Sequence, residues 1–155
     1  ALEEFKSEHG DYPRTNDLEG DAETLPLLTG KRLFLALSSY VDKHGEPYGN
    51  KEDRPKTFIK SDVFSFGEKD GDNDKIKEVT LDLSDSSGDA PECFVIDPWG
   101  NPYVYDYPRR DERKLGFLLF SKGEDGKSFD FTKAKDDSSS AESENDDDLD
   151  NVGEW

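Results

Sequence analysis

The chain has 155 residues, of which 31% are hydrophobic and 37% are charged, so it has room for one domain with a modest core and a large solvated fraction. Lys and Arg total 20 against 38 Asp and Glu, and the net charge of −18 argues against nucleic acid and anionic membrane surfaces as partners. The single cysteine, Cys93, excludes an internal disulfide and lies in an apolar run, which indicates a buried thiol and not a nucleophile.

The first ten residues have the pattern of a helix. Leu2, Phe5 and His9 fall on one helical stripe, and the sequence predicts a helix over 1–10. His9 is expected to be a surface residue. Because the sequence starts inside this helix without a Met, we expect that it is the end of a longer helix and that an upstream segment was removed.

A second helix is predicted near 25–43. Thr24 is a suitable N-cap, Pro26 lies in the first turn, and Gly45 is expected to follow the end of the helix. This is the most apolar segment of the chain, and we expect it to cover the core. Its apolar stripe comprises Leu27, Leu33, Phe34, Leu37, Tyr40 and Val41.

The middle of the chain, 46–96, contains three short strand-like runs. Residues 56–59 and 63–66 are rich in aromatic and branched side chains, and residues 79–83 alternate apolar and polar side chains. We predict a strand at each of them.

An acidic loop precedes the third of these runs. Asp70, Asp72 and Asp74 have the spacing of the first three ligands of an EF-hand. Lys75 stands where the EF-hand needs glycine, and Leu81 where it needs a bidentate glutamate. We therefore interpret 67–74 as a polar hairpin loop.

A proline-bounded turn at 97–103 separates the middle of the chain from two further strands. Its prolines restrict the backbone, and Gly100 followed by Asn tolerates positive φ, so we expect a rigid turn. Strands are predicted at 103–107 and 117–121, and the short charged connection between them favours antiparallel pairing. We expect Trp99 to pack over this sheet against a helix.

The C-terminal part is acidic. A glycine-flanked turn at 122–126 presents acidic side chains, and 133–144 has the composition of a disordered segment. The chain ends at 145–155 in an aspartate cluster and a terminal Trp, which indicates a tail that returns to the body. Ca²⁺ accepts about 6–8 oxygen ligands in flexible geometry and could hold such a tail. The alternative is a solvated acidic tail.

Several of these blocks together resemble the globular part of the major pseudopilin of type II secretion. They are Asp-Pro-Trp-Gly-Asn-Pro-Tyr at 97–103, Leu-Phe-Ser-Lys-Gly-Glu-Asp-Gly at 119–126, and Asp-Asp-Leu at 147–149 ahead of the terminal Trp155. Residues 1–13 are similar to the end of that family's long N-terminal helix and the Tyr-Pro after it.

The resemblance implies one α+β pilin-like domain over 1–155, with an N-terminal helix packed on a small antiparallel sheet and an extended C-terminal calcium loop at 122–155. The interval before the turn at 97–103 is longer than the family leads us to expect, so 45–96 is a possible family-atypical insert. In that family, an apolar helix half that a prepilin peptidase cleaves and methylates anchors the subunit in the bacterial inner membrane, with the globular domain in the periplasm. It later packs inside a fibre.

The resemblance also implies a function and a metal site. The function is that of a structural subunit of a periplasmic pseudopilus that drives protein export, with other pseudopilins and secretion machinery as partners. Carried over by motif, the Ca²⁺ ligands are Asp125, Asp147 and Asp148, with Asp146 as a rival ligand and the Lys122 carbonyl as a backbone ligand.

Other classes of function remain open. An enzyme is not expected, because two isolated histidines and one buried thiol assemble no nucleophile with a base. The alternatives are a secreted or surface calcium-binding structural module, and a pilin-like subunit of another envelope machine. A prepilin-type leader followed by about 20 apolar residues would favour the pseudopilin. We expect this chain to be monomeric or weakly associated in solution.

Overall fold

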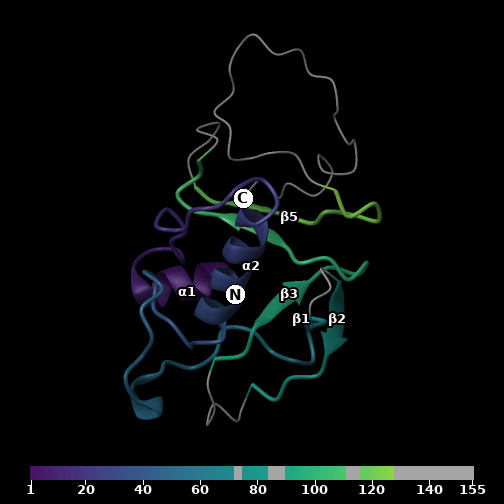
Figure 1. The fold of residues 1–155 in the computed structure, drawn as a ribbon. Coiled ribbons are helices and arrows are strands. Elements are labelled where there is room, and N and C mark those ends of the chain that lie inside the picture. The colour runs from purple at the N-terminus through teal and green to yellow at the C-terminus, as the bar shows by residue number, and fades with distance from the viewer. Residues whose placement is uncertain (72–74, 84–89, 111–115, 128–155) are drawn as a thin grey trace.

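The computed structural model describes residues 1–71, 75–83, 90–110 and 116–127, which form an α+β fold with small antiparallel sheets (Figure 1). In chain order, its elements are α1 (Leu2–His9), α2 (Leu25–Leu37), a short 3₁₀ turn (Lys51–Asp53), β1 (Ser65–Lys69), β2 (Ile76–Val79), β3 (Cys93–Ile96), β4 (Val104–Asp106) and β5 (Leu118–Phe120). Within the described ranges, no helix is both long enough and apolar enough to cross a lipid bilayer.

The predicted N-terminal helix is confirmed as α1. It ends at Gly10, whose φ of 75° lets its N–H bond back to the carbonyl of Lys6. Phe5 is fully buried in the main core. The expectation that His9 is a surface residue is wrong, because its ring lies 4.2 Å from that of Phe5 and 5.6 Å from that of Phe58.

The second helix begins where the sequence predicts but is shorter than 25–43. It ends at Leu37, because Ser38 donates its hydroxyl to the Phe34 carbonyl at 2.6 Å and Ser39 adopts a φ of 63°. The Leu37 carbonyl then accepts the N–H of Phe58 at 2.8 Å. Gly45 does not cap the helix and instead has a φ of 86° in a separate tight turn.

The strands form two antiparallel sheets, with orders β2-β1-β3 and β4-β5. The pairing predicted for 103–107 and 117–121 is confirmed, since Val104 lies opposite Phe120 and Asp106 opposite Leu118. β1 is the central strand of the three-stranded sheet and pairs with β2 on one side and with β3 on the other.

Several predicted boundaries in the middle of the chain are wrong. Residues 56–59 form no strand, although Ile59 is fully buried in the core. β1 begins at Ser65 and continues through part of the predicted hairpin loop, and β2 lies a few residues before 79–83. The hairpin itself is present. Residues 72–74 of its acidic loop lie outside the described residues.

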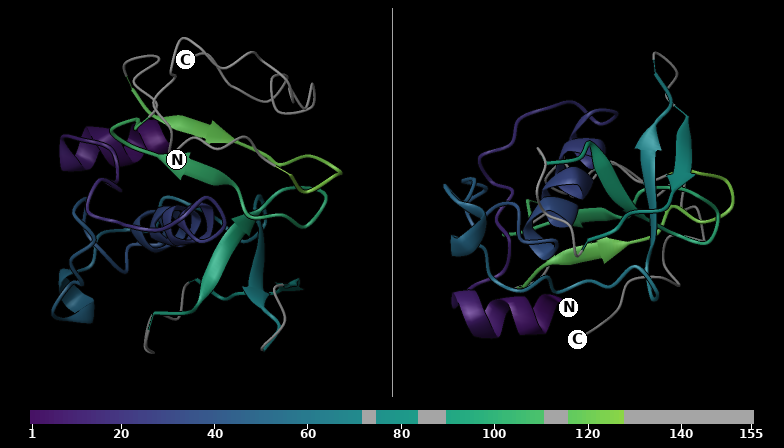
Figure 2. Two further views of the ribbon diagram at one scale, coloured as in Figure 1. Left: turned by 45° about the horizontal axis from the view of Figure 1, so that its top comes forward. Right: turned by 90° about the horizontal axis from the view of Figure 1, so that it is seen from below.

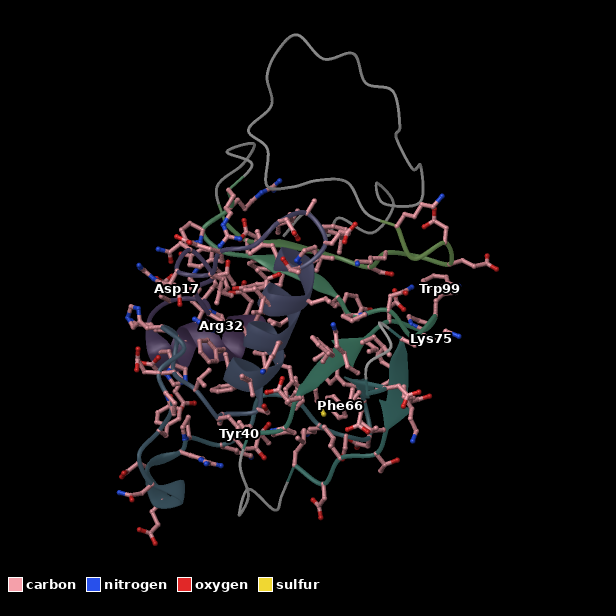
Figure 3. The ribbon with its side chains drawn as sticks, in the orientation of Figure 1. Asp17, Arg32, Tyr40, Phe66, Lys75 and Trp99 are labelled. Carbon is pink, nitrogen blue, oxygen red and sulfur yellow. The ribbon has the colours of Figure 1, made fainter. Side chains whose placement is uncertain are left out.

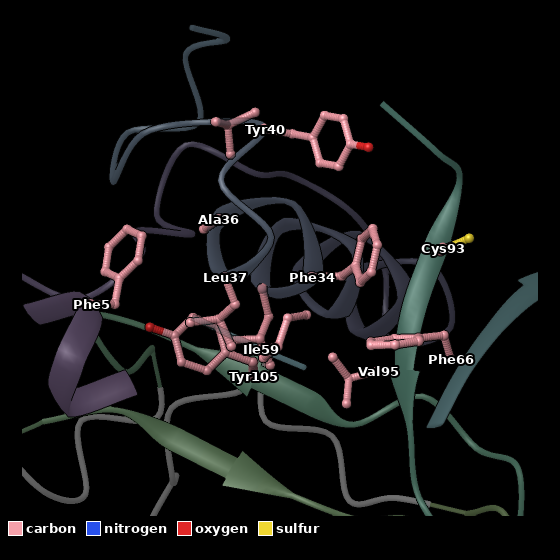
Figure 4. Close-up of a cluster of buried hydrophobic side chains, with 12 residues drawn as sticks. Phe5, Phe34, Ala36, Leu37, Tyr40, Ile59, Phe66, Cys93, Val95 and Tyr105 are labelled. Carbon is pink, nitrogen blue, oxygen red and sulfur yellow. The ribbon is translucent and has the colours of Figure 1, made fainter. Parts of the chain in front are cut away.

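The core surrounds α2, which lies between α1 and β3 (Figures 2 and 4). Phe34 of α2 meets Phe66 of β1 edge-on, with ring centroids 5.7 Å apart. Cys93 is buried as predicted. Burial, together with the charges of Glu68 and Glu92, raises the pKa of its thiol to about 11, which argues against a role as a nucleophile.

Candidate functional site

Two turns that are distant in sequence meet at one edge of the molecule (Figures 1 and 2). The first, 97–103, connects β3 to β4, and we call it the Asp97 turn. The second, 121–127, follows β5, and we call it the Gly123 turn. Both leave the strands of the two sheets at this edge, so the sheets fix where each turn starts.

The carboxylate of Asp97 organises the first turn. Asp97 is only 2% exposed, and its Oδ1 accepts the backbone N–H groups of Trp99 at 3.0 Å and Asn101 at 2.8 Å. The backbone of Asp97 also bonds to Asn101 and Gly100, and Gly100 takes the positive φ of 87° that the turn requires. The prediction of a tight turn is confirmed.

Trp99 does not lie where the sequence predicts. The expectation that it packs over the sheet against a helix is wrong, because the side chain is 53% exposed and lies at the tip of the Asp97 turn (Figure 3). The bonds to Asp97 hold the backbone of Trp99 in a tight loop outside the core. An indole is therefore presented to solvent from a well-bonded turn.

Side chains from both turns lock them together. Ser121 donates its hydroxyl to Oδ2 of Asp97 at 2.6 Å in a buried bond, and the same hydroxyl oxygen accepts the N–H of Gly123 at 2.9 Å. The side-chain amide of Asn101 donates to the Gly123 carbonyl at 2.8 Å. Buried hydrogen bonds to a carboxylate are among the stronger ones in proteins, so the Gly123 turn is held firmly against the Asp97 turn.

Beyond this lock, the Gly123 turn presents oxygen atoms to solvent. Gly123 and Gly126 have φ values of 65° and 69°. Gly126 has little room for a side chain, because an added Cβ would lie 3.3 Å from Oδ1 of Asn101. Asp125 is exposed, and its Oδ1 accepts the N–H of Lys127 at 2.9 Å. Lys122 lies at the base of the turn and is partly buried.

The predicted metal ligands are only partly covered by the structure. Lys122 and Asp125 lie on one turn, as their spacing implies. Asp146, Asp147 and Asp148 lie outside the described residues. Among the residues that are described, no three His, Cys, Asp or Glu side chains converge as a metal site.

Sequence reasoning missed the residues that build the site, namely Asp97, Asn101 and Ser121. An Asp at the start of a turn that contains Pro and Gly often accepts the backbone N–H groups that follow it. This local signal could have identified Asp97. The bond between Ser121 and Asp97 joins residues 24 positions apart in the sequence, so no local pattern predicts it.

Comparison with protein families, with curated proteins and with solved structures found no match to this chain.

Proposed function

We propose that the chain is the globular part of a pseudopilin-like subunit, which assembles with other subunits into a periplasmic fibre that drives protein export. Its C-terminal loop would be stabilised by Ca²⁺. In this proposal the full-length protein is anchored in the bacterial inner membrane by an upstream apolar helix. That helix would also be the main contact with other pseudopilins and the secretion machinery.

One observation carries the proposal: a locked turn presents oxygen donors at the start of a highly acidic tail. The Ser121 and Asn101 bonds fix the backbone of this turn, so the Asp125 carboxylate and the Lys122 carbonyl sit on a rigid base. A preformed base lowers the entropy that must be offset when a metal binds. The α+β arrangement, with α1 packed on the core, is also compatible with a pilin-like head.

The donor set suits calcium. Within the described part of the chain, Asp125 uses only its Oδ1 as a hydrogen-bond acceptor, which leaves carboxylate oxygen for a cation. The other proposed ligands, Asp146, Asp147, Asp148 and the Lys122 carbonyl, are hard oxygen donors as well. Ca²⁺ accepts about 6–8 such oxygens in flexible geometry, whereas Mg²⁺ requires a compact octahedron and keeps its water, so Mg²⁺ should substitute poorly.

Thermal melting with calcium and with a chelator tests the site. A metal that binds only the folded chain stabilises it by RT ln(1 + [L]/Kd), which is about 2.7 kcal/mol at a hundredfold excess over Kd. For a chain of this length, that corresponds to a shift of about 5–11 °C in Tm. We expect this shift in the wild type and its loss in Asp125→Ala.

Glu124→Ala is the matched control, because it removes a neighbouring exposed carboxylate from the same turn. It should keep most of the calcium-dependent shift. If chelator leaves the wild-type midpoint unchanged, or if both variants lose the shift equally, the acidic tail binds no specific ion.

Two alternative functions would use the same turn, and other observations distinguish them from the pseudopilin. A secreted or surface calcium-binding module would have the same calcium response, and the coding sequence upstream of Ala1 distinguishes it. A prepilin-type leader followed by about 20 apolar residues supports the pseudopilin, and an ordinary signal peptide supports the module. A pilin-like subunit of another envelope machine is favoured by 45–96, which supplies β1, β2, β3 and part of the core.

A further inference from the structure

The side chain of Asn101 lies between the Asp97 turn and the Gly123 turn. Its Nδ2 donates to the Gly123 carbonyl at 2.8 Å, and because a carbonyl can only accept, this bond decides which end of the amide faces that carbonyl. The backbone of Asn101 is fixed as well. Its N–H donates to Oδ1 of Asp97 at 2.8 Å, and its carbonyl accepts the N–H of Asp97 at 2.9 Å. These bonds together set the direction of the remaining amide oxygen, Oδ1 of Asn101.

This oxygen faces the part of the Gly123 turn that carries the proposed metal ligand Asp125. A Cβ added at Gly126, the next residue, would lie 3.3 Å from Oδ1 of Asn101. The lack of a side chain at 126 therefore keeps the space beside the oxygen open. Within the described part of the chain, Oδ1 of Asn101 accepts no hydrogen bond from the protein. It is a fixed oxygen donor without a protein partner.

The carbonyl of Gly123 is a poorer candidate for a metal ligand. It accepts the side-chain amide of Asn101 and also the N–H of Gly126 at 3.4 Å, and these bonds use both of its lone pairs. The amide oxygen of Asn101 has no such competition. It also has suitable chemistry, because Ca²⁺ sites in proteins commonly use Asn carbonyl oxygens. A neutral ligand adds an oxygen to a site rich in carboxylates without adding to their mutual repulsion.

We propose that Oδ1 of Asn101 is a ligand of the same Ca²⁺ that the Gly123 turn binds. The inference rests on the proposed function in taking that ion to be present. It adds a ligand from outside 122–155, which the resemblance does not imply. The ion then joins the acidic loop directly to the Asp97 turn, whose carboxylate holds the backbone of Asn101 in place.

Two substitutions of Asn101 separate a ligand from a residue that only positions the turn. Asn101→Ala removes Oδ1 together with the bond from Nδ2 to Gly123, whereas Asn101→Asp removes that bond and keeps a side-chain oxygen. Tb³⁺ replaces Ca²⁺ in oxygen sites, and its emission lifetimes in H₂O and D₂O count the water molecules bound to it. We expect about one additional bound water in Asn101→Ala and none in Asn101→Asp, because water takes the place of a lost oxygen ligand.

Calcium affinity, measured by titration calorimetry, gives a second readout. Asn101→Ala should weaken Ca²⁺ binding about tenfold or more, because it removes a ligand and a bond that orients the turn. Asn50→Ala is the matched control. The exposed Asn50 also donates its side-chain amide to another residue, Asp53 at 3.1 Å, but it lies outside both turns. It should leave the calcium affinity and the bound water unchanged.

Gly126→Ala tests the same oxygen without changing Asn101, and it keeps the proposal testable if Asn101→Ala does not fold. Its matched control is Gly71→Ala, because Gly126 and Gly71 have φ values of 69° and 56° and both substitutions strain the backbone. Only the Cβ at 126 approaches Asn101, since a Cβ at 71 meets nothing within 4 Å. Gly126→Ala should weaken Ca²⁺ binding about tenfold and Gly71→Ala should not.

The outcomes distinguish this inference from the proposed function. If the wild type binds neither ion, the calcium loop is wrong and the Asn101 ligand is wrong with it. If the wild type binds, but Asn101→Ala gains no water, or Asn101→Asp gains the same water, Asn101 is not a ligand and the calcium loop stands. Equal calcium affinity of Gly126→Ala and Gly71→Ala also contradicts the ligand alone.

Discussion

Replacing Asp97 by Ala is expected to destabilise the protein strongly although the residue lies in a turn. Its carboxylate accepts bonds from the N–H of Trp99, the N–H of Asn101 and the hydroxyl of Ser121, at 3.0, 2.8 and 2.6 Å. A hydrogen bond to a charged group contributes about 1.5–3 kcal/mol. Because water can reach the groups freed near the exposed Trp99, we take the lower end for each of the three bonds and expect a loss of about 4.5 kcal/mol.

The assay is urea unfolding followed by far-UV circular dichroism. In a thermal melt, a loss of this size would lower Tm by about 9–18 °C for a chain of this length. Asp97→Asn is the control, because its carbonyl oxygen still accepts both backbone N–H groups while the charge is lost, and it should cost about 1 kcal/mol. If Asp97→Ala lies within 1 kcal/mol of the wild type, the carboxylate does not hold the two turns together, and the rigid base proposed for the metal site is lost with it.

Two further predictions concern packing and pH. In α2, a Cβ added at Gly30 would lie 2.8 Å from the Tyr103 carbonyl oxygen. Gly30→Ala should therefore lower the free energy of unfolding, measured in urea, by about 1–3 kcal/mol. Gly49→Ala is the control and should be neutral, because a Cβ added there meets nothing within 4 Å. Burial raises the pKa of Asp11, but hydrogen bonds from Tyr107 and Arg14 outweigh it and hold that pKa below its ordinary value of 3.8. Asp11 therefore stabilises the fold above that pH, and Tyr107→Phe should cost about 1 kcal/mol at pH 7. That cost should shrink as the pH falls below 3.8, and a cost that is constant with pH would contradict the assignment.

Local patterns predicted those elements whose signals are local. The helical stripe of Leu2 and Phe5 identified α1, and the short charged connection predicted the antiparallel pairing of β4 with β5. The end of α2 was missed because the apolar periodicity continues through Tyr40 and Val41, which are buried beyond the helix. Contacts with Phe58 and a positive φ at Ser39 end the helix, and these depend on the tertiary fold.

The site shows the same division between local and tertiary signals. The glycines at 123 and 126 predicted the turn that carries Lys122 and Asp125. The residue type of Trp99 predicted a buried side chain, because large aromatic side chains are usually buried. The hydrogen bonds of Asp97 instead hold Trp99 outside the core. The contact of Ser121 with Asp97 arises only when the two sheets are assembled.

The most direct test of the calcium proposal is a calcium titration followed by amide NMR of the labelled chain. The account predicts saturable binding of one ion, with the largest shifts at the amides of 122–127 and of Asp146, Asp147 and Asp148. Asp125→Ala should remove these shifts, and Glu124→Ala should not. Non-saturating shifts spread over exposed carboxylates throughout the chain, with none concentrated on the Gly123 turn, would contradict it.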